Sequence, residues 1–397
     1  MPAGTNSSDT SAPPDARQDL TILRRLKLTS FRSYAELETV FPEGPQVVVG
    51  PNAAGKTNLV ESLVVAGTGH SHRASLDGEL IAWGADFARI EADVESAGAE
   101  GTGRNVSRIE LVLTRTSAGG GRKKAQVNGV ARRPSALGAA LPVVLFAPED
   151  MLLIVGSPSG RRGQVDTLVA QTVPAAAATM ATYARALTQR NNLLRAVRDG
   201  FAAPDELRFW DGVIVEEGSK IVDWRRGALA ALSRPIADAH SEIAPDEPAL
   251  ELAYLSKEAP GPDETTAEAI RRRLAETAEK EQWNGQTLVG PHRDDISFVS
   301  AGRDLSGYAS RGQQRTAILA FKLATLDVLR RTYDRPPLLL LDDVFSELDP
   351  QRRAHLVRRI GELPQAFITT TTADDLDPAL VAASTVWQVA PGRLSPG

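Results

Sequence analysis

The segment GPNAAGKT at residues 50–57 constrains the fold more than any other part of the chain. It fits the pattern G-x-x-x-x-G-K-[ST] and stands between the apolar stretch QVVVG and a helical pattern, KTNLVESLVVAGTG. A glycine-rich loop between a strand and a helix turns backbone N–H groups toward phosphates, and the helix N-terminus adds partial positive charge. The sequence therefore predicts an α/β fold with a phosphate-binding P-loop.

Individual residues of this loop have expected tasks. Gly50 and Gly55 let the backbone wrap closely around phosphates, Lys56 reaches the β- and γ-phosphates and assists catalysis, and the Thr57 hydroxyl holds Mg²⁺. A glycine-rich turn without a ligand is the alternative, but it does not explain the flanking strand and helix. The predicted nucleotide-binding residues of the loop are Gly50, Pro51, Asn52, Ala53, Ala54, Gly55, Lys56, Thr57 and Asn58.

A second half of such a site lies near the other end of the chain, in PPLLLLDDVFSELD. Residues 338–341 predict a buried strand, after which Asp342 is expected to anchor Mg²⁺ and Asp343 to orient an attacking water. Adjacent carboxylates at the end of an apolar strand are costly without such a task. Because Lys56 and Asp342 are so far apart in sequence, we expect one nucleotide site assembled from both chain ends.

The segments between these motifs predict two kinds of structure. Strand-like stretches recur up to about residue 160, and helical periodicity then dominates as far as residue 289. We therefore expect an ATPase head formed by residues 20–160 and 290–397, and a mostly helical second lobe at 161–289. Residues 1–19, rich in Ser, Pro and Asp, are expected to be a disordered tail.

Composition narrows the class of protein. The chain is 42% hydrophobic and 24% charged, which is typical of a folded domain. It contains neither an apolar run long enough to span a membrane nor a signal-peptide pattern, so we expect a cytoplasmic protein without a membrane partner. The net charge of −5 means that nucleic acid could bind only through local basic patches.

Seven ordered motifs after residue 20 resemble the RecF family, relatives of the SMC-type and transporter-type (ABC) ATPases. The resemblance implies an ABC/SMC-type ATPase head, recombinational repair and replication restart, and binding of ATP and DNA. It also implies an ATP-dependent homodimer acting with RecO and RecR mediators to help RecA load at single-strand gaps. The motifs are LKLTSFRSY, VVVGPNAAGKTNLVESL, GTGHSHR, FAPEDMLLIVGSPSGRRGQVD, LVGPHRDDISF, SRGQQRTAILAFKLA and LLLLDDVFSELD.

The segment YASRGQQR, residues 308–315, is similar to the signature loop L-S-G-G-Q of these ATPases. The resemblance assigns Ser310, Gly312 and Gln313 to the γ-phosphate held by a second molecule, so that two chains sandwich ATP head to tail. Ala309 and Arg311 depart from the signature. Without its context the segment predicts only the cap of the following helix.

Two further departures concern hydrolysis. Transporters usually have Asp-Glu where this chain has Asp342-Asp343, and we expect the shorter carboxylate to give a slow, DNA-stimulated ATPase that resets a DNA clamp. Transporters also carry a histidine where this chain has Thr369–Thr372, one of which could sense the phosphate. The segment 146–150, FAPED, is a candidate for coupling between the lobes.

Weaker signals leave alternatives open. His70 and His72 make a poor metal site without carboxylate or Cys partners, so a structural role is favoured. For His292 and Arg293 we favour lobe packing or contact near DNA over catalysis. The predicted DNA contacts lie on one hairpin, and few aromatics accompany them, which favours backbone recognition of duplex over base reading or tight single-strand binding. The expected DNA partners are duplex and single-strand/duplex junctions. These contacts are Arg122, Lys123, Lys124, Arg132 and Arg133.

Three other classes of protein were weighed. A transport-energising ATPase would need a membrane partner and a shorter insert. A chromosome-organising head would need coiled-coil arms, for which no heptad pattern is present. A small-molecule phosphotransferase would leave SRGQQ and SELD unexplained.

Overall fold

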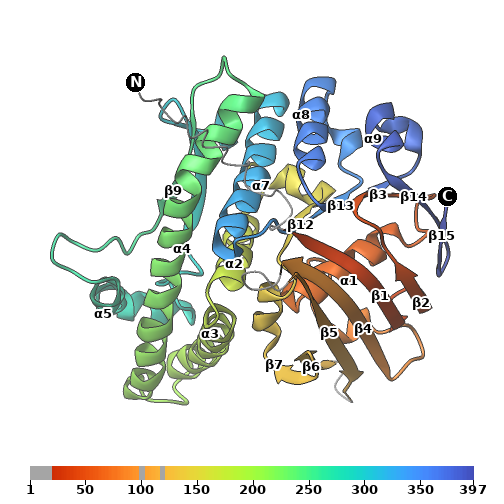
Figure 1. The fold of residues 1–397 in the computed structure, drawn as a ribbon. Helices are drawn as coiled ribbons and strands as arrows, with labels where there is room; N and C mark the ends of the chain where they lie inside the picture. Colours follow the sequence, from red (N-terminus) through yellow and green to blue (C-terminus); the bar gives the residue numbers. More distant parts are fainter. Residues whose placement is uncertain (1–19, 98–102, 117–120) are drawn as a thin grey trace, which may run out of the picture.

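The computed structural model describes residues 20–97, 103–116 and 121–397 (Figure 1). The tail expected at residues 1–19 lies outside these ranges. Among the described residues, no helix combines the length and apolarity needed to cross a lipid bilayer.

A six-stranded sheet at the centre of the fold joins the two ends of the chain. Its order is β15-β14-β3-β13-β12-β8, and its strands are parallel except that β15 runs antiparallel to β14. The early strand β3 thus lies between two late strands, which confirms the prediction of a head assembled from both ends. The strands are β3 (Gly44–Val49), β8 (Val143–Phe146), β12 (Leu338–Asp342), β13 (Gln365–Thr370), β14 (Thr385–Ala390) and β15 (Arg393–Pro396).

A second, antiparallel sheet covers helix α1 (Lys56–Thr68) from the other side. Ten of the 13 residues of α1 are buried, because the helix packs between the two sheets and needs apolar side chains all round. The sheet order is β2-β1-β4-β5-β6-β7. Its strands are β1 (Thr21–Phe31), β2 (Tyr34–Val40), β4 (Phe87–Ala97), β5 (Arg104–Arg115), β6 (Gly121–Val127) and β7 (Val130–Arg132).

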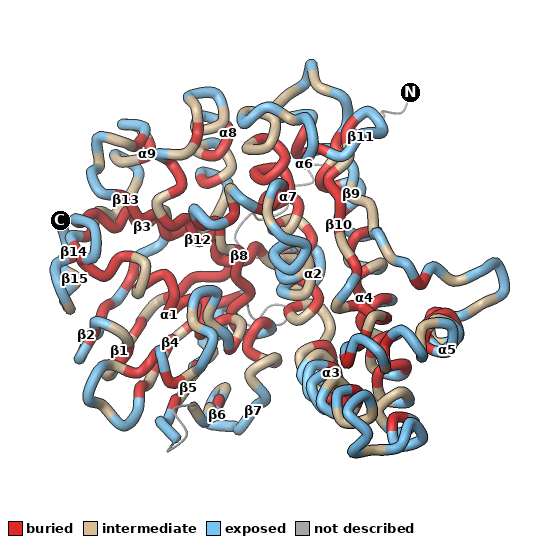
Figure 2. Tube along the Cα trace, turned by 180° about the vertical axis from the view of Figure 1, so that it is seen from behind, coloured by how far each residue is buried: buried red, intermediate tan, exposed pale blue. Residues whose placement is uncertain are grey.

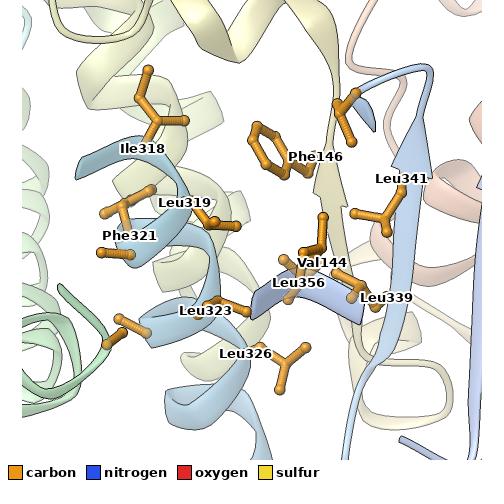
Figure 3. Close-up of a cluster of buried hydrophobic side chains, with 14 of the residues drawn as sticks. Val144, Phe146, Ile318, Leu319, Phe321, Leu323, Leu326, Leu339, Leu341 and Leu356 are labelled. Carbon is orange, nitrogen blue, oxygen red and sulfur yellow. The ribbon is translucent and has the colours of Figure 1, made fainter. Parts of the chain in front are cut away.

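Strand β12 shows why four leucines occur in a row. Leu338 and Leu340 pack in the cluster that contains α1, whereas Leu339 and Leu341 pack in the cluster that contains helix α7 (Arg311–Tyr333). Figure 3 shows this second cluster, with Leu339 and Leu341 facing Ile318 and Leu323 of α7 across Val144 and Phe146 of β8. A parallel strand covered on both faces requires a continuous apolar run. Figure 2 shows β3, β12 and β13 buried along nearly their whole length.

The predicted helical region is confirmed, with one exception. Four helices follow β8, and they stand beside the sheets on the left of Figure 1: α2 (Pro158–Thr172), α3 (Ala176–Arg198), α4 (Leu207–Ile243) and α5 (Thr266–Asn284). The exception is strand β9 (Leu250–Leu255), which pairs with β10 (Asp295–Ser300) and forms a small sheet with β11 (Arg303–Asp304). Helix α7 packs against α4 in the same core that covers the parallel sheet.

Short elements complete the head. The remaining helices are α6 (Leu305–Tyr308), α8 (Pro350–Gly361) and α9 (Pro378–Ala382). Single 3₁₀ turns occur at Asp77–Leu80, Pro134–Ala139, Pro148–Leu152, Pro204–Glu206, Phe345–Glu347 and Ala373–Asp375.

Candidate functional site

The glycine-rich loop runs from the end of β3 to the start of α1, as predicted. Lys56 is only 6% exposed, and its Nζ donates hydrogen bonds to the carbonyl oxygens of Gly50 (2.6 Å) and Pro51 (3.2 Å). A Cβ on Gly50 would lie 2.6 Å from the Val389 carbonyl oxygen, so only glycine fits there. Gly55 has a φ of 115°, a conformation that favours glycine. The amine is thus held inside the loop by backbone carbonyls.

A neighbouring turn, not predicted from the sequence, supports this loop from the antiparallel sheet. The Tyr34 hydroxyl donates to the Gly55 carbonyl oxygen (3.1 Å), and Asn58 Nδ2 donates to Ser33 Oγ (2.9 Å). Pro51, Asn52 and Ala53 are exposed, Ala54 and Gly55 are buried, and Thr57 and Asn58 are half-buried. The tip of the loop is therefore open to a ligand, while its base is fixed by the protein.

The two predicted carboxylates lie at the same edge of the sheet as the loop. Strands β3, β13 and β12 are parallel neighbours, so their carboxyl ends meet there. Asp342 is the last residue of β12 and is 4% exposed. Asp343 follows with a φ of 54°, in the left-handed region that non-glycine residues rarely adopt.

Thr369 joins these carboxylates and was only one of four candidate threonines in the sequence. Its Oγ1 donates to Asp342 Oδ1 (2.6 Å) and accepts a hydrogen bond from the Asp343 backbone N–H (3.0 Å). Thr370 Oγ1 donates instead to the Thr372 carbonyl oxygen (2.9 Å). Thr369 is thus the threonine that orients the carboxylate pair, a role that depends on β12 and β13 being neighbours.

The pKa of Asp343 reflects its position between charges. Burial raises its pKa above the ordinary aspartate value, nearby Lys56 opposes the shift, and the Asp342 carboxylate adds to it. The fold therefore brings Lys56, Asp342 and Asp343 into one electrostatic environment, as the sequence predicted. A side chain with a raised pKa at such a place is well suited to proton chemistry.

The donor set at this edge fits Mg²⁺. Thr57 supplies a hydroxyl in the first turn of α1 and Asp342 a carboxylate, and both are hard oxygen ligands. Only one Asp342 oxygen accepts a hydrogen bond from the described residues, so the other is free for a ligand. Mg²⁺ typically binds one or two carboxylates together with substrate phosphates rather than a full protein cage.

The predicted signature loop caps helix α7. Ser310 Oγ accepts from the Gln313 backbone N–H (3.2 Å), and Gln313 Oε1 accepts from the Ser310 N–H (3.0 Å), which is a capping box. Within the described ranges, no hydrogen bond or ion pair connects residues 310–313 to residues 50–58. Arg311 is exposed at the helix start. The loop thus forms the N-terminal end of helix α7 without a polar link to the chain's own phosphate loop among the described residues.

A buried ion pair connects α7 to the segment that follows β8. Lys322 and Asp150 are 5% and 6% exposed, and their charged groups lie 2.9 Å apart. Gln164 of α2 bridges both, accepting from Lys322 Nζ and donating to Asp150 Oδ1, each at 2.8 Å. The FAPED segment, expected to couple the lobes, is therefore linked directly to α2 and α7.

The predicted basic hairpin is formed by β6 and β7, but it does not carry five free cations. Lys123 forms an ion pair with Asp77 (2.7 Å), donates to the Gly69 carbonyl oxygen, and is only 8% exposed. The prediction is wrong for this residue, because successive side chains of a strand point to opposite faces. The other four residues are exposed: Arg122, Lys124, Arg132 and Arg133.

The 69–73 segment is anchored to helix α1, but its two histidine side chains are exposed. Glu61 of α1 accepts a hydrogen bond from Ser71 Oγ (2.5 Å) and two 2.8 Å hydrogen bonds from Arg32. Partial desolvation by the surrounding protein lowers the pKa of His70 and His72. Among the described residues, no group of three or more His, Cys, Asp or Glu side chains is arranged to hold a metal ion.

His292 lies in the loop before β10 and contacts helix α3. Its Nδ1 is 2.7 Å from the Tyr183 hydroxyl, and burial lowers its pKa to about 4. Arg293 donates to the Thr287 carbonyl oxygen (2.9 Å). These contacts join α3 to the loop before β10, in agreement with the packing role favoured from the sequence.

Comparisons with known proteins agree with this geometry. The family model described as "RecF/RecN/SMC N terminal domain" matches residues 22–391. The chain is 40% identical to "DNA replication and repair protein RecF" of Symbiobacterium thermophilum, over 89% of this chain and 92% of the relative. It is 36% identical to the protein of the same name from Heliobacterium modesticaldum, over 94% of this chain and 98% of the relative.

Solved structures give the same result. The structure titled "Structure of the recombination mediator protein RecF-ATPrS in RecFOR pathway" matches with a TM-score of 0.84 and 28% identity, covering 96% of this chain and 99% of that chain. A second, titled as the RecF-ATP form, matches with a TM-score of 0.82 and 28% identity, covering 96% and 98%. On its motifs, its fold and these relatives, the chain belongs to the RecF family.

Proposed function

We propose that this chain is an ATP-dependent DNA-binding protein of recombinational repair and replication restart. The observation that carries the proposal is the edge of the parallel sheet where Lys56, Asp342 and Asp343 come together. Within the described residues, Ser310 hydrogen-bonds only within its own helix cap and to none of these three side chains. Solved relatives are titled as RecF with ATP in the RecFOR pathway, which supports ATP as the nucleotide and a mediator role.

ATP would bind through the phosphate loop, with Mg²⁺ held by Thr57 and Asp342. Lys56 would exchange its two backbone acceptors for phosphate oxygens. The fold therefore holds the Lys56 amine close to the position of the phosphates before ATP binds. Bound Mg²⁺ would neutralise part of the negative charge of the phosphates. The remaining loop residues, 50–55 and Asn58, would surround the phosphates, with backbone N–H groups from all of them except Pro51, which has none.

The site is completed by a second copy of the chain. Ser310, Gly312 and Gln313 stand at the start of a 23-residue helix, where the partial positive charge suits an anion. Among the described residues, no hydrogen bond or ion pair joins them to the chain's own phosphate loop, which supports head-to-tail pairing through ATP. Asp343 would orient the attacking water, and its short side chain supports slow hydrolysis. Hydrolysis, stimulated by DNA, would reopen the dimer.

The clamp formed in this way would hold DNA through the exposed cations Arg122, Lys124, Arg132 and Arg133. Phosphate contacts of this kind give affinity without sequence preference. We further propose that residues 20–160 and 290–397 act as the head and residues 161–289 as a second lobe. RecR- and RecO-type mediators would be its protein partners, with RecA acting downstream.

A complementation experiment tests dimerisation through ATP. Lys56→Ala removes the phosphate-binding amine, and Ser310→Arg fills the signature position with a bulky cation. Each variant alone should stay monomeric with ATP in analytical ultracentrifugation and bind duplex DNA as weakly as wild type without ATP. An equal mixture should regain part of both properties, because one of the two sites in the mixed dimer is intact.

Each variant measured alone is the control for the mixture, because the mixture contains the same two proteins and differs only in allowing mixed dimers. A wild type that stays monomeric with ATP, or whose DNA affinity ATP does not change, would falsify the clamp. A mixture no better than the separate variants would exclude the head-to-tail arrangement while leaving ATP binding possible.

A further inference from the structure

A tryptophan stands fully exposed beside the antiparallel sheet. Trp83 has a relative exposure of 102%, the largest of the exposed hydrophobic side chains in the described part of the chain. Indole is amphipathic and normally buries most of its surface, so an uncovered indole marks a contact surface. Nothing in the phosphate-loop site accounts for it.

The backbone around Trp83 is fixed rather than loose. Ala85 N–H donates to the Ala82 carbonyl oxygen (3.1 Å), and Gly84 has a φ of 81°, which together describe a type II turn with Trp83 at its second position. The Ala82 N–H donates to the Ser30 carbonyl oxygen of β1 (2.8 Å). The fold therefore presents the ring to solvent from a defined position at the sheet margin.

A second aromatic and a row of cations lie next to this turn. Phe87, at the start of β4, is 42% exposed and is paired across the sheet with Thr114, which is paired in turn with Arg122. One step along, Arg89 is paired with Val112, which is paired with Lys124. Directly paired residues of antiparallel strands point to the same face. These side chains thus share the outer face of β4, β5 and β6.

The cations of this face are largely free for an external anion. Arg122 and Lys124 form no ion pair or side-chain hydrogen bond with any residue in the described ranges. The guanidinium of Arg115, beside the turn, donates among the described residues only to the Ala85 carbonyl oxygen (3.4 Å). Arg89 is the exception, with Glu110 at 3.4 Å. In a single strand of nucleic acid, bases can stack on exposed aromatic rings while the neighbouring phosphates contact unpaired cations, and this surface offers both groups side by side.

We propose that this surface, made of Trp83, Phe87, Arg122 and Lys124, binds single-stranded DNA, with an unpaired base stacked on the indole. Phosphates of the same strand would contact Arg122 and Lys124. The inference rests on the proposed DNA-binding function and adds to it a residue that distinguishes single strands from duplex, whose bases are already stacked. Such a surface would let the protein recognise the single-stranded side of a junction.

Fluorescence gives a direct readout. The chain contains five tryptophans, of which Trp83 and Trp283 are the most exposed, at 102% and 79%. With ATP present, an oligothymidylate of about 16 nucleotides, the upper site size of one single-strand module, should quench emission of wild type. Trp283→Phe is the matched control and should keep the quench, whereas Trp83→Phe should lose it.

Affinity for labelled DNA completes the test. Trp83→Ala should weaken oligothymidylate binding about 5- to 150-fold, the range for loss of one stacked base, and Trp83→Phe should retain most of the affinity. Duplex affinity should stay within about twofold for both variants, as expected of an exposed site. Circular dichroism checks that the variants fold.

The results separate this inference from the function on which it rests. If oligothymidylate binds Trp83→Ala as it binds wild type, or if Trp83→Phe is as weak as Trp83→Ala, the stacking surface is refuted. Equal loss of duplex and single-strand binding also refutes it. If wild type binds neither kind of DNA, the proposed function fails as well.

Discussion

Replacing Thr369 by valine tests how the site depends on a side chain outside every recognised motif. Thr369 is completely buried, and its Oγ1 joins Asp342 Oδ1 at 2.6 Å to the Asp343 N–H at 3.0 Å. Valine has nearly the same shape, so packing is kept while both hydrogen bonds are lost. The Asp343 N–H still donates to the backbone carbonyl oxygen of residue 369 (3.2 Å), so the main loss is the hydrogen bond to the Asp342 carboxylate.

The expected loss of stability follows from the energy of this hydrogen bond to the Asp342 carboxylate. A hydrogen bond to a charged group contributes about 1.5–3 kcal/mol, and Asp342, at 4% exposure, has little water to replace it. We expect the free energy of unfolding to fall by about 2 kcal/mol. For a chain of this length the entropy of unfolding is about 0.8 kcal/mol/K, so Tm should fall by about 2–3 °C. Misplaced carboxylates should slow ATP hydrolysis about 10- to 100-fold, equivalent to about 1.4–2.7 kcal/mol.

Single-turnover ATP hydrolysis and urea denaturation measure the two effects. Thr370→Val is the matched control, because Thr370 is also buried on β13 but its hydroxyl bonds, among the described residues, only to the Thr372 carbonyl oxygen. It should lose some stability and keep hydrolysis, and Thr369→Ser should restore both quantities. Hydrolysis by Thr369→Val at the wild-type rate, or an equal loss in Thr370→Val, would refute the reasoning.

Three further predictions rest on single contacts. Because burial raises the pKa of Asp343, its ionised form destabilises the fold at neutral pH, and this cost disappears as pH falls through the folded-state pKa. Asp343→Asn should therefore abolish hydrolysis, yet it should unfold at a higher urea concentration than wild type at neutral pH. This difference in urea midpoint should shrink as the pH is lowered, and a constant or reversed difference would contradict the prediction. Lys322→Met leaves Asp150 buried without its cation and should cost about 3–5 kcal/mol in urea denaturation, part of which Asp150→Leu in the same chain should restore. Lys124→Ala should weaken duplex binding and reduce the slope of log K against log[salt] by about 0.9. Lys123→Ala should change neither quantity, because the Lys123 amine is paired with Asp77. Equal effects of the two substitutions would show that both side chains contact DNA.

Local chemistry let the sequence determine several parts of this protein. Gly50, Gly55 and Lys56 have a required order along a strand, a loop and a helix, so the phosphate loop could be predicted from adjacent residues alone. The leucine run of β12 likewise predicted a strand buried on both faces. The sequence also predicted that the two ends of the chain come together in one domain, because a nucleotide site needs both the phosphate loop and the acidic strand end.

The tertiary structure decided what depends on neighbours distant in sequence. Thr369 could not be distinguished from Thr370–Thr372 until β13 was seen beside β12, and strand β9 needed its partner β10. Lys123 and Lys124 look alike in sequence, but pairing with Asp77 takes one of them away from solvent. Trp83 gives no sequence signal at all, since exposure is a property of what fails to cover a side chain. Sequence specifies contacts made within a few residues, whereas these roles arise from through-space contacts that only the folded chain creates.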